Sequence, residues 1–153
     1  MKRFKILRPV STDFADKLKA IDKESGENLS KNLERGLMAI PLLAHEALTT
    51  AYINDVDSLG VFAQQLYGFG RPRDVFLGIS TSGNSKNVML ATVVARALGL
   101  KVIGLTGTKG GELAIVADVA IKVPEKETYM IQELHLPVYH CLCLMLEDRF
   151  LGE

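Results

Sequence analysis

Four short stretches of the chain are apolar without the alternation that marks a half-exposed strand. They are LMAIPLL (37–43), DVFLGIS (74–80), KVIGLT (101–106) and DVAIKVP (118–124). Continuous apolar runs of this length are typical of strands that are covered on both faces, as in parallel sheets. We therefore predict a strand at each of the four stretches.

Helical patterns follow each predicted strand. SLGVFAQQLYGFG comes after the first, SKNVMLATVVARALGL after the second, with Gly99 as its stop, and GGELAIVA after the third. The longest candidate, KETYMIQELHLPVYHCLCLMLEDRFLGE, comes after the fourth. Strands that alternate with helices predict right-handed crossovers and a helix layer on each face. The predicted fold class is α/β: a three-layer, flavodoxin-like sandwich with a parallel sheet flanked by helices.

The domain organisation is expected to be simple. A chain of 153 residues is the size of one domain, and we predict a single domain over residues 1–153. Residues 1–36 are polar and form a helical and loop segment that leads into an α/β core at 37–151. A doubly wound sheet usually opens on a strand, whereas MKRFKILRP reads as a helix end that runs into a loop before Pro9. We therefore expect this chain to be N-terminally short of the opening strand–helix unit.

The composition excludes two classes of partner. Eighteen basic and eighteen acidic residues cancel, so no positive field is available to hold nucleic acid. The apolar runs are too short to span a membrane, and the N-terminus has no apolar signal-peptide core. Cys141 and Cys143 stand at i,i+2 on a predicted helix and cannot bond to each other. These features favour a reduced, cytoplasmic protein.

The turn STSGNS (80–85) follows the second predicted strand and opens a helix. Ligands of open α/β sheets bind at such carboxyl ends, and the free N–H groups of a helix N-terminus favour an anion. Four hydroxyls are candidates for binding phosphate: Ser80, Thr81, Ser82 and Ser85. The alternative is an ordinary helix cap, since Ser is common there. Four hydroxyls around two glycines favour phosphate, and neither a P-loop lysine nor GxGxxG is present.

A second glycine-rich turn, TGTKGGELA (106–114), follows the third predicted strand. We favour a short loop with a helix cap as its interpretation. The alternative is that it forms part of a ligand pocket's wall.

IQELHLPVYH (131–140) places two of the three histidines on an apolar helix. Gln132 and His140 are eight residues apart, which is roughly 12 Å of rise on one straight helix. They would meet one ligand only across a kink at Pro137, or if the helix began near Leu136. A histidine on such a helix is more often a hydrogen-bonded core residue than a functional one.

Other stretches offer acid–base groups. His45 and Glu46 follow the first predicted strand and are either an acid–base pair or a helix cap with a first-turn acid. Glu133 is a further carboxylate candidate. The final helix spreads apolar residues around more than one face, which predicts an oligomer. These residues are Leu136, Val138, Tyr139, Leu142, Leu144, Met145 and Leu146.

GISTSGNSKNV, GLKVIGLTGTKGGELAIVADVAIKVP and IQELHLPVYHCLCLMLED together resemble the sugar isomerase (SIS) domain family, and within it the sedoheptulose 7-phosphate isomerase type. The resemblance covers about residues 37–150. It implies a five-stranded parallel sheet, a phosphosugar held by Ser80, Thr81, Ser82 and Ser85, and proton transfer by His140. It also implies a metal, usually zinc, that Gln132 and His140 help to bind in some members, and a homotetramer with pockets at subunit interfaces.

The resemblance also has departures. Family members carry, before the segment matching RFK, a strand with a glycine-rich turn and then a helix with a His and a Glu that bind metal. Neither is found in this chain, so we expect weak zinc binding and isomerase activity near background. We expect a phosphosugar aldose–ketose isomerase; the alternative is a non-catalytic SIS module that binds a phosphosugar and regulates or assembles with a partner.

Overall fold

The structure is a computed structural model that describes residues 8–151. These described residues divide into two compact units, one made of residues 8–39 with 140–151, and the other of residues 40–139.

A parallel three-stranded sheet is the centre of the 40–139 unit. β1 (Val75–Ile79), β2 (Lys101–Thr106) and β3 (Val119–Lys122) stand in the order β1-β2-β3. The register pairs Phe76 with Val102 and Leu105 with Ile121. Three of the predicted strands are confirmed, as is their parallel pairing.

The prediction of a strand at 37–43 is wrong, because these residues form none. Pro41 has no N–H to donate to a ladder, and no strand in the described residues pairs with this stretch. Its apolar side chains are therefore largely solvent-exposed, with Met38 at 90% and Leu43 at 71%.

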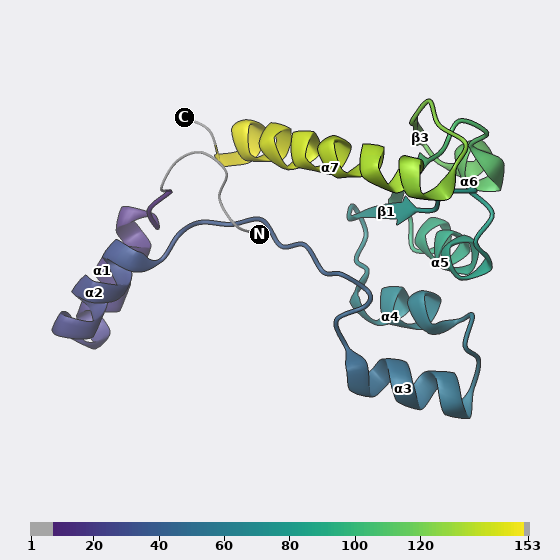
Figure 1. The fold of residues 1–153 in the computed structure, drawn as a ribbon. Helices are drawn as coiled ribbons and strands as arrows, with labels where there is room; N and C mark the ends of the chain where they lie inside the picture. Colours follow the sequence, from purple (N-terminus) through teal and green to yellow (C-terminus); the bar gives the residue numbers. More distant parts are fainter. Residues whose placement is uncertain (1–7, 152–153) are drawn as a thin grey trace. The chain divides into compact units, whose positions relative to one another are not determined.

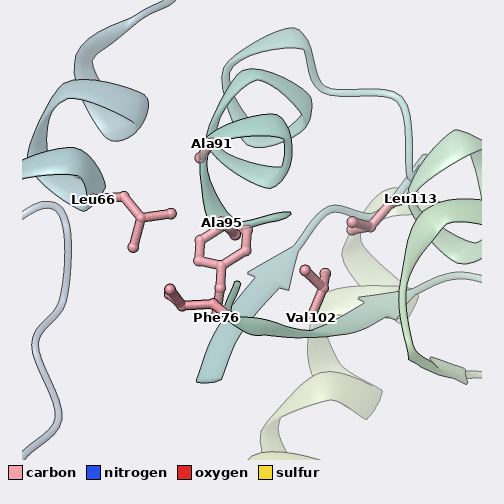
Figure 2. Close-up of a cluster of buried hydrophobic side chains, with 7 residues drawn as sticks. Leu66, Phe76, Ala91, Ala95, Val102 and Leu113 are labelled. Carbon is pink, nitrogen blue, oxygen red and sulfur yellow. The ribbon is translucent and has the colours of Figure 1, made fainter. Parts of the chain in front are cut away.

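One face of the sheet is covered by helices that the pattern predicted. α5 (Lys86–Ala97) and the short α6 (Gly111–Val116) pack there, and α4 (Val61–Phe69) packs against α5 (Figure 1). α3 (Glu46–Asp55), which was not predicted, lies beside α4. Gly99 ends α5 with φ +75°, as its predicted role as a stop requires. The core lies between these helices and the strands (Figure 2) and consists of Leu66, Phe76, Ala91, Ala95, Leu100, Val102 and Leu113.

α7 (Thr128–Leu151) begins on the opposite side of the sheet (Figure 1). It is one helix that continues through Pro137, so the alternative in which the helix began near Leu136 is wrong. Ile131 and His135, one turn apart, are both 3% exposed and mark its buried side. Helices on both faces of a parallel sheet confirm the α/β sandwich.

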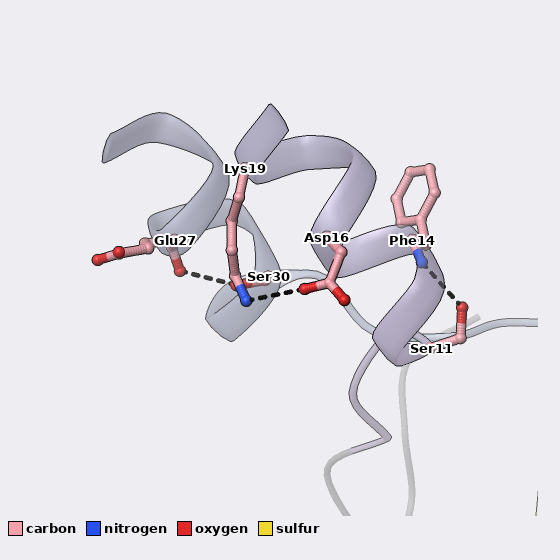
Figure 3. Close-up of polar contacts among 6 residues, drawn as sticks. All are labelled: Ser11, Phe14, Asp16, Lys19, Glu27 and Ser30. Carbon is pink, nitrogen blue, oxygen red and sulfur yellow. Dashed lines mark hydrogen bonds and ion pairs between the residues drawn. The ribbon is translucent and has the colours of Figure 1, made fainter. Parts of the chain in front are cut away.

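The other unit contains an α-hairpin of α1 (Thr12–Ile21) and α2 (Lys23–Asn32) (Figure 1). Each helix has a side-chain cap: Ser11 accepts from the N–H of Phe14 (Figure 3), and Asp22 accepts from that of Ser25. Gly26 lets the helices touch, because a Cβ there would lie 2.5 Å from the backbone of Leu18.

Beside the hairpin, this unit holds a buried ion pair. Arg8 and Glu147 are 3.1 Å apart, and their side chains are 10% and 2% exposed. The N–H of Arg35 donates to the carbonyl oxygen of Arg8 at 2.8 Å, which holds the two stretches of chain together. Among residues 8–151, no helix combines the length and apolarity needed to cross a membrane.

Candidate phosphate-binding site

The predicted hydroxyl-rich turn connects β1 to α5, and Ser85 is the N-cap residue of that helix. Gly83 adopts φ +69°, which side-chain-bearing residues rarely do. A Cβ on Gly83 would lie 1.8 Å from the carbonyl oxygen of Gly110. The turn after β1 is therefore pressed against the turn after β2, and only glycine fits at the contact.

The two turns are also joined by hydrogen bonds. The N–H of Gly107 donates to the carbonyl oxygen of Thr81 at 3.0 Å, and that of Leu113 to Gly83 at 2.9 Å. The side-chain oxygen of Asn84 accepts from the N–H of Glu112 at 2.9 Å. The turn at 106–114, for which we favoured a short loop with a helix cap, is therefore hydrogen-bonded to the turn after β1.

The four candidate hydroxyls have different roles within the turn. Ser80 is 4% exposed, and its oxygen lies 2.8 Å from that of Ser85 and accepts from the N–H of Gly83 at 3.1 Å. Ser82 accepts from the N–H of Asn84 at 3.1 Å, which leaves its own O–H available to donate. Ser80 and Ser85 therefore shape the turn, whereas Thr81 and Ser82 line a cavity beside it.

This cavity has a volume of about 490 Å³. Pockets that hold small molecules are typically about 300–1,000 Å³. Three segments contribute: the turn after β1, the turn after β2, and the start of α7. The lining residues are Thr81, Ser82, Asn84, Thr108, Lys109, Glu125, Lys126, Glu127, Thr128 and Ile131. Hydroxyls, an amide and ammonium groups are the donors that a phosphorylated polyol needs.

Gln132 and His140 both lie on α7, and both are exposed. With eight residues between them on one helix, their rise differs by roughly 12 Å. Gln132 follows Ile131, which lines the cavity, but is not itself a lining residue. Their roles in catalysis stay predictions.

The sequence of residues 18–107 matches the family model of the SIS domain. The chain belongs to the SIS domain family. Relatives include proteins named phosphoheptose isomerase from Geotalea daltonii, 46% identical over 78% of this chain, and Akkermansia muciniphila, 43% identical over 74%. The chain spans about three fifths of the length of these curated relatives, 62% and 60% respectively.

Solved structures show the same similarity. A phosphoheptose isomerase from Francisella tularensis superposes with a TM-score of 0.71 at 32% identity, over 89% of this chain and 70% of that one. One from Neisseria gonorrhoeae gives 0.70 at 36% identity, over 93% and 76%. The SIS fold is thus confirmed, although the sheet of the described residues has three strands and not the five that the resemblance implied.

Among residues 8–151, no group of three His, Cys, Asp or Glu side chains is placed to hold a metal ion. Structural and catalytic zinc sites need three or four protein ligands, and Gln132 with His140 would give two. Zinc binding through them stays a prediction, and we derive no chemical step through a metal.

The other acid–base candidates have structural surroundings. His45 is the N-cap residue of α3, and its ring centroid lies 4.9 Å from that of Phe69. Glu46 is the first-turn acid of the same helix, where a carboxylate suits the helix dipole. The side chain of His45 makes no capping hydrogen bond and contacts the ring of Phe69, so only Glu46 has the structural role expected of it, as a first-turn acid.

Thr108 and Lys109 line the cavity, so the alternative that the turn at 106–114 forms part of a pocket wall is confirmed. Sequence reasoning did not find Lys126 and Thr128, which also line the cavity, although Lys126 is more than 40 positions from the turn after β1. Their signal was position, since they follow the carboxyl end of β3. His135 was also unassigned: its Nε2 is buried with no hydrogen-bond partner among the described residues.

Proposed function

We propose that this chain is the phosphosugar-binding part of an aldose–ketose isomerase of the sedoheptulose 7-phosphate type. The observation that carries the proposal is the hydroxyl-rich turn at the carboxyl end of β1, open to a cavity of about 490 Å³. The names of the similar proteins from Geotalea daltonii and Akkermansia muciniphila support the choice of sugar.

In this proposal the phosphate lies at the start of α5. The O–H groups of Thr81 and Ser82 donate to phosphate oxygens, and the N-terminal N–H groups of α5 add a favourable dipole. The hydrogen bond between Ser80 and Ser85 holds the turn in this shape before the ligand arrives. A turn that is already ordered loses little conformational entropy on binding.

Isomerisation would need a base that removes a proton next to the carbonyl and an acid that protonates the enediolate oxygen. We assign one of these roles to His140, and to Gln132 a hydrogen bond that orients the sugar. Glu133, exposed on the same helix, is the carboxylate candidate that no structural role explains.

A second candidate function is a non-catalytic SIS module that binds a phosphosugar and regulates or assembles with a partner. The observation in its favour is that Gln132 and His140 stand roughly two turns apart on one helix. Such a module would share the phosphate site and lack turnover.

Calorimetric titration with sedoheptulose 7-phosphate, beside an assay of its isomerisation, tests both. Replacing Thr81 by Val together with Ser82 by Ala should weaken binding by ~1–3 kcal/mol, the range for hydrogen bonds to a charged group. Ser58→Ala, an exposed serine in the loop before α4, is the control. Unchanged affinity in the double variant would remove the phosphate site; binding without turnover would favour the non-catalytic module.

We further infer a cytoplasmic homotetramer. The free thiols of the two cysteines of α7 suit a reducing compartment. Apolar side chains that are exposed on β1 and on α7 support the oligomer.

A further inference from the structure

The cavity beside the phosphate turn carries two lysines that the proposed function does not use. Lys109 follows β2 and Lys126 precedes α7, and both side chains are exposed while their residues line the cavity. Neither lysine forms an ion pair within residues 8–151, in contrast to Lys101, which pairs with Asp118 at 2.8 Å. Two cations at a cavity lined by hydroxyls suggest a ligand with concentrated negative charge.

A backbone hydrogen bond places the two lysines at the same edge of the cavity, which we call its rim. The N–H of Thr108 donates to the carbonyl oxygen of Glu125 at 3.0 Å. The residue after each of these partners is a lysine. The hydrogen bond therefore fixes the distance between the backbones of the two lysines, while their long side chains can move to reach a ligand.

The carboxylates at this rim limit which ligands fit. Glu125 and Glu127 also line the cavity, so its two lysines and two glutamates balance formally. A balanced rim attracts a small anion weakly by charge alone. It suits a ligand with an anionic end for the lysines and hydroxyl groups that donate to the glutamates.

We propose that Lys109 and Lys126 form a cationic clamp that recognises the phosphate of a polyol phosphate in its dianionic form, together with Thr81 and Ser82. This inference rests on the proposed function and specifies its ligand: a sugar monophosphate bound through its phosphate, with hydroxyls toward Glu125 and Glu127. The second pKa of a phosphate ester is about 6, so the dianion predominates at neutral pH.

The test is calorimetric titration of the full chain with sedoheptulose 7-phosphate and with unphosphorylated sedoheptulose. Lys109→Met and Lys126→Met should each weaken binding of the phosphate ester by roughly threefold to tenfold. This loss lies between the contribution of an exposed ion pair and that of a hydrogen bond to a charged group. Binding of the unphosphorylated sugar should not change. Arginine at either position should keep most of the affinity, because it restores the charge.

Lys86→Met is the matched control. Lys86 is exposed and follows the phosphate turn directly, but it does not line the cavity. Its loss should change affinity by less than about twofold at 0.15 M salt, because an exposed ammonium group that makes no direct contact with the ligand contributes little. The loss caused by the cavity lysines should shrink as salt is raised.

The outcomes separate the two proposals. A wild-type chain that binds the phosphate ester and keeps its affinity in both methionine variants would overturn the clamp and leave the proposed function standing. An equal loss in the Lys86 control would also overturn it, because general charge would then suffice. A wild-type chain that binds no phosphate ester would overturn both proposals.

Discussion

At the scale of single residues, Gly83 has the most constrained position in the candidate site. Its φ is +69°, and a Cβ added there would lie only 1.8 Å from the Gly110 oxygen, so no side chain fits unless one turn moves. We expect Gly83→Ala to lower the free energy of unfolding by at least about 1–3 kcal/mol, the usual range for a strained backbone conformation. Urea denaturation measures it.

Gly68 gives the matched control for this substitution. It lies in α4, and a Cβ there would meet nothing within 4 Å. Gly68→Ala should leave stability unchanged or raise it by up to about 1 kcal/mol, because alanine favours helix. Equal destabilisation by the two substitutions would mean that glycine flexibility, not the contact between turns, matters at Gly83.

Residues of the site differ in how far the sequence could locate them. The hydroxyls at 80–85 are adjacent in the chain, so a strand end and a helix cap were enough to predict the turn. Which hydroxyls shape the turn and which line the cavity was not predictable, because the hydrogen bond between Ser80 and Ser85 depends on side-chain geometry. Lys126 reaches the same cavity only through the strand order β1-β2-β3, which no local pattern encodes.

At the scale of elements, Asp118 ties β3 to β2. Its carboxylate accepts from the ammonium of Lys101 and the N–H of Val102, both at 2.8 Å. The hydrogen bond from Lys101, then that from Val102, lowers the pKa of Asp118 below its ordinary 3.8. A lowered folded-state pKa stabilises the fold above the ordinary value, and this stabilisation is lost as pH falls through the lowered pKa.

Asp118→Asn should therefore be less stable than the wild type at neutral pH, and the difference should shrink as pH falls below about 4. Urea midpoints measured from pH 2.5 to 7 would show it. Glu112→Gln, an exposed carboxyl on α6, provides the comparison. A difference between Asp118→Asn and wild type that stays constant over this range would show that the charge of Asp118 contributes nothing to folding.

α6 is held to the sheet by one buried side chain. Leu113 is 0% exposed, and it fits because Gly104 has no side chain: a Cβ on Gly104 would lie 3.0 Å from the Cγ of Leu113. Leu113→Ala should cost about 2–5 kcal/mol of unfolding free energy, as for other buried leucines. Ile115→Ala on the same helix, 83% exposed, should change it by less than about 0.5 kcal/mol. Similar losses in the two variants, measured by urea denaturation, would contradict this packing.

The stretch 37–43 shows why one element was predicted wrongly. Its run of apolar residues is as strand-like as β2, yet a strand forms only where another strand supplies hydrogen-bond partners. In the described residues none is placed beside it, and Pro41 removes one donor. Sequence periodicity reports what a segment can bury, whereas the presence of a partner is a property of the whole fold.

At the scale of the whole molecule, apolar side chains are solvent-exposed on β1 and on α7, as they are at 37–43. One surface is the sheet face of β1, where Val75, Leu77 and Ile79 all exceed the exposure of a core residue. Another is the C-terminal half of α7, with Met145 and Phe150. Contiguous apolar patches on soluble proteins usually mark interaction sites. These surfaces support the proposed oligomer, whose form we expect to be a tetramer.

The oligomer can be tested by placing charge on α7. We expect light scattering at micromolar concentration to give a mass several times 16.8 kDa for the wild type. Met145→Lys combined with Phe150→Glu should lower it, because a buried unpaired charge in an interface costs more than the contact it replaces. Ile115→Lys, which adds charge to an exposed apolar residue of α6, should leave the mass unchanged. A wild-type mass equal to one chain would refute the oligomer, and the exposed face of β1 would then belong to contacts with a different partner.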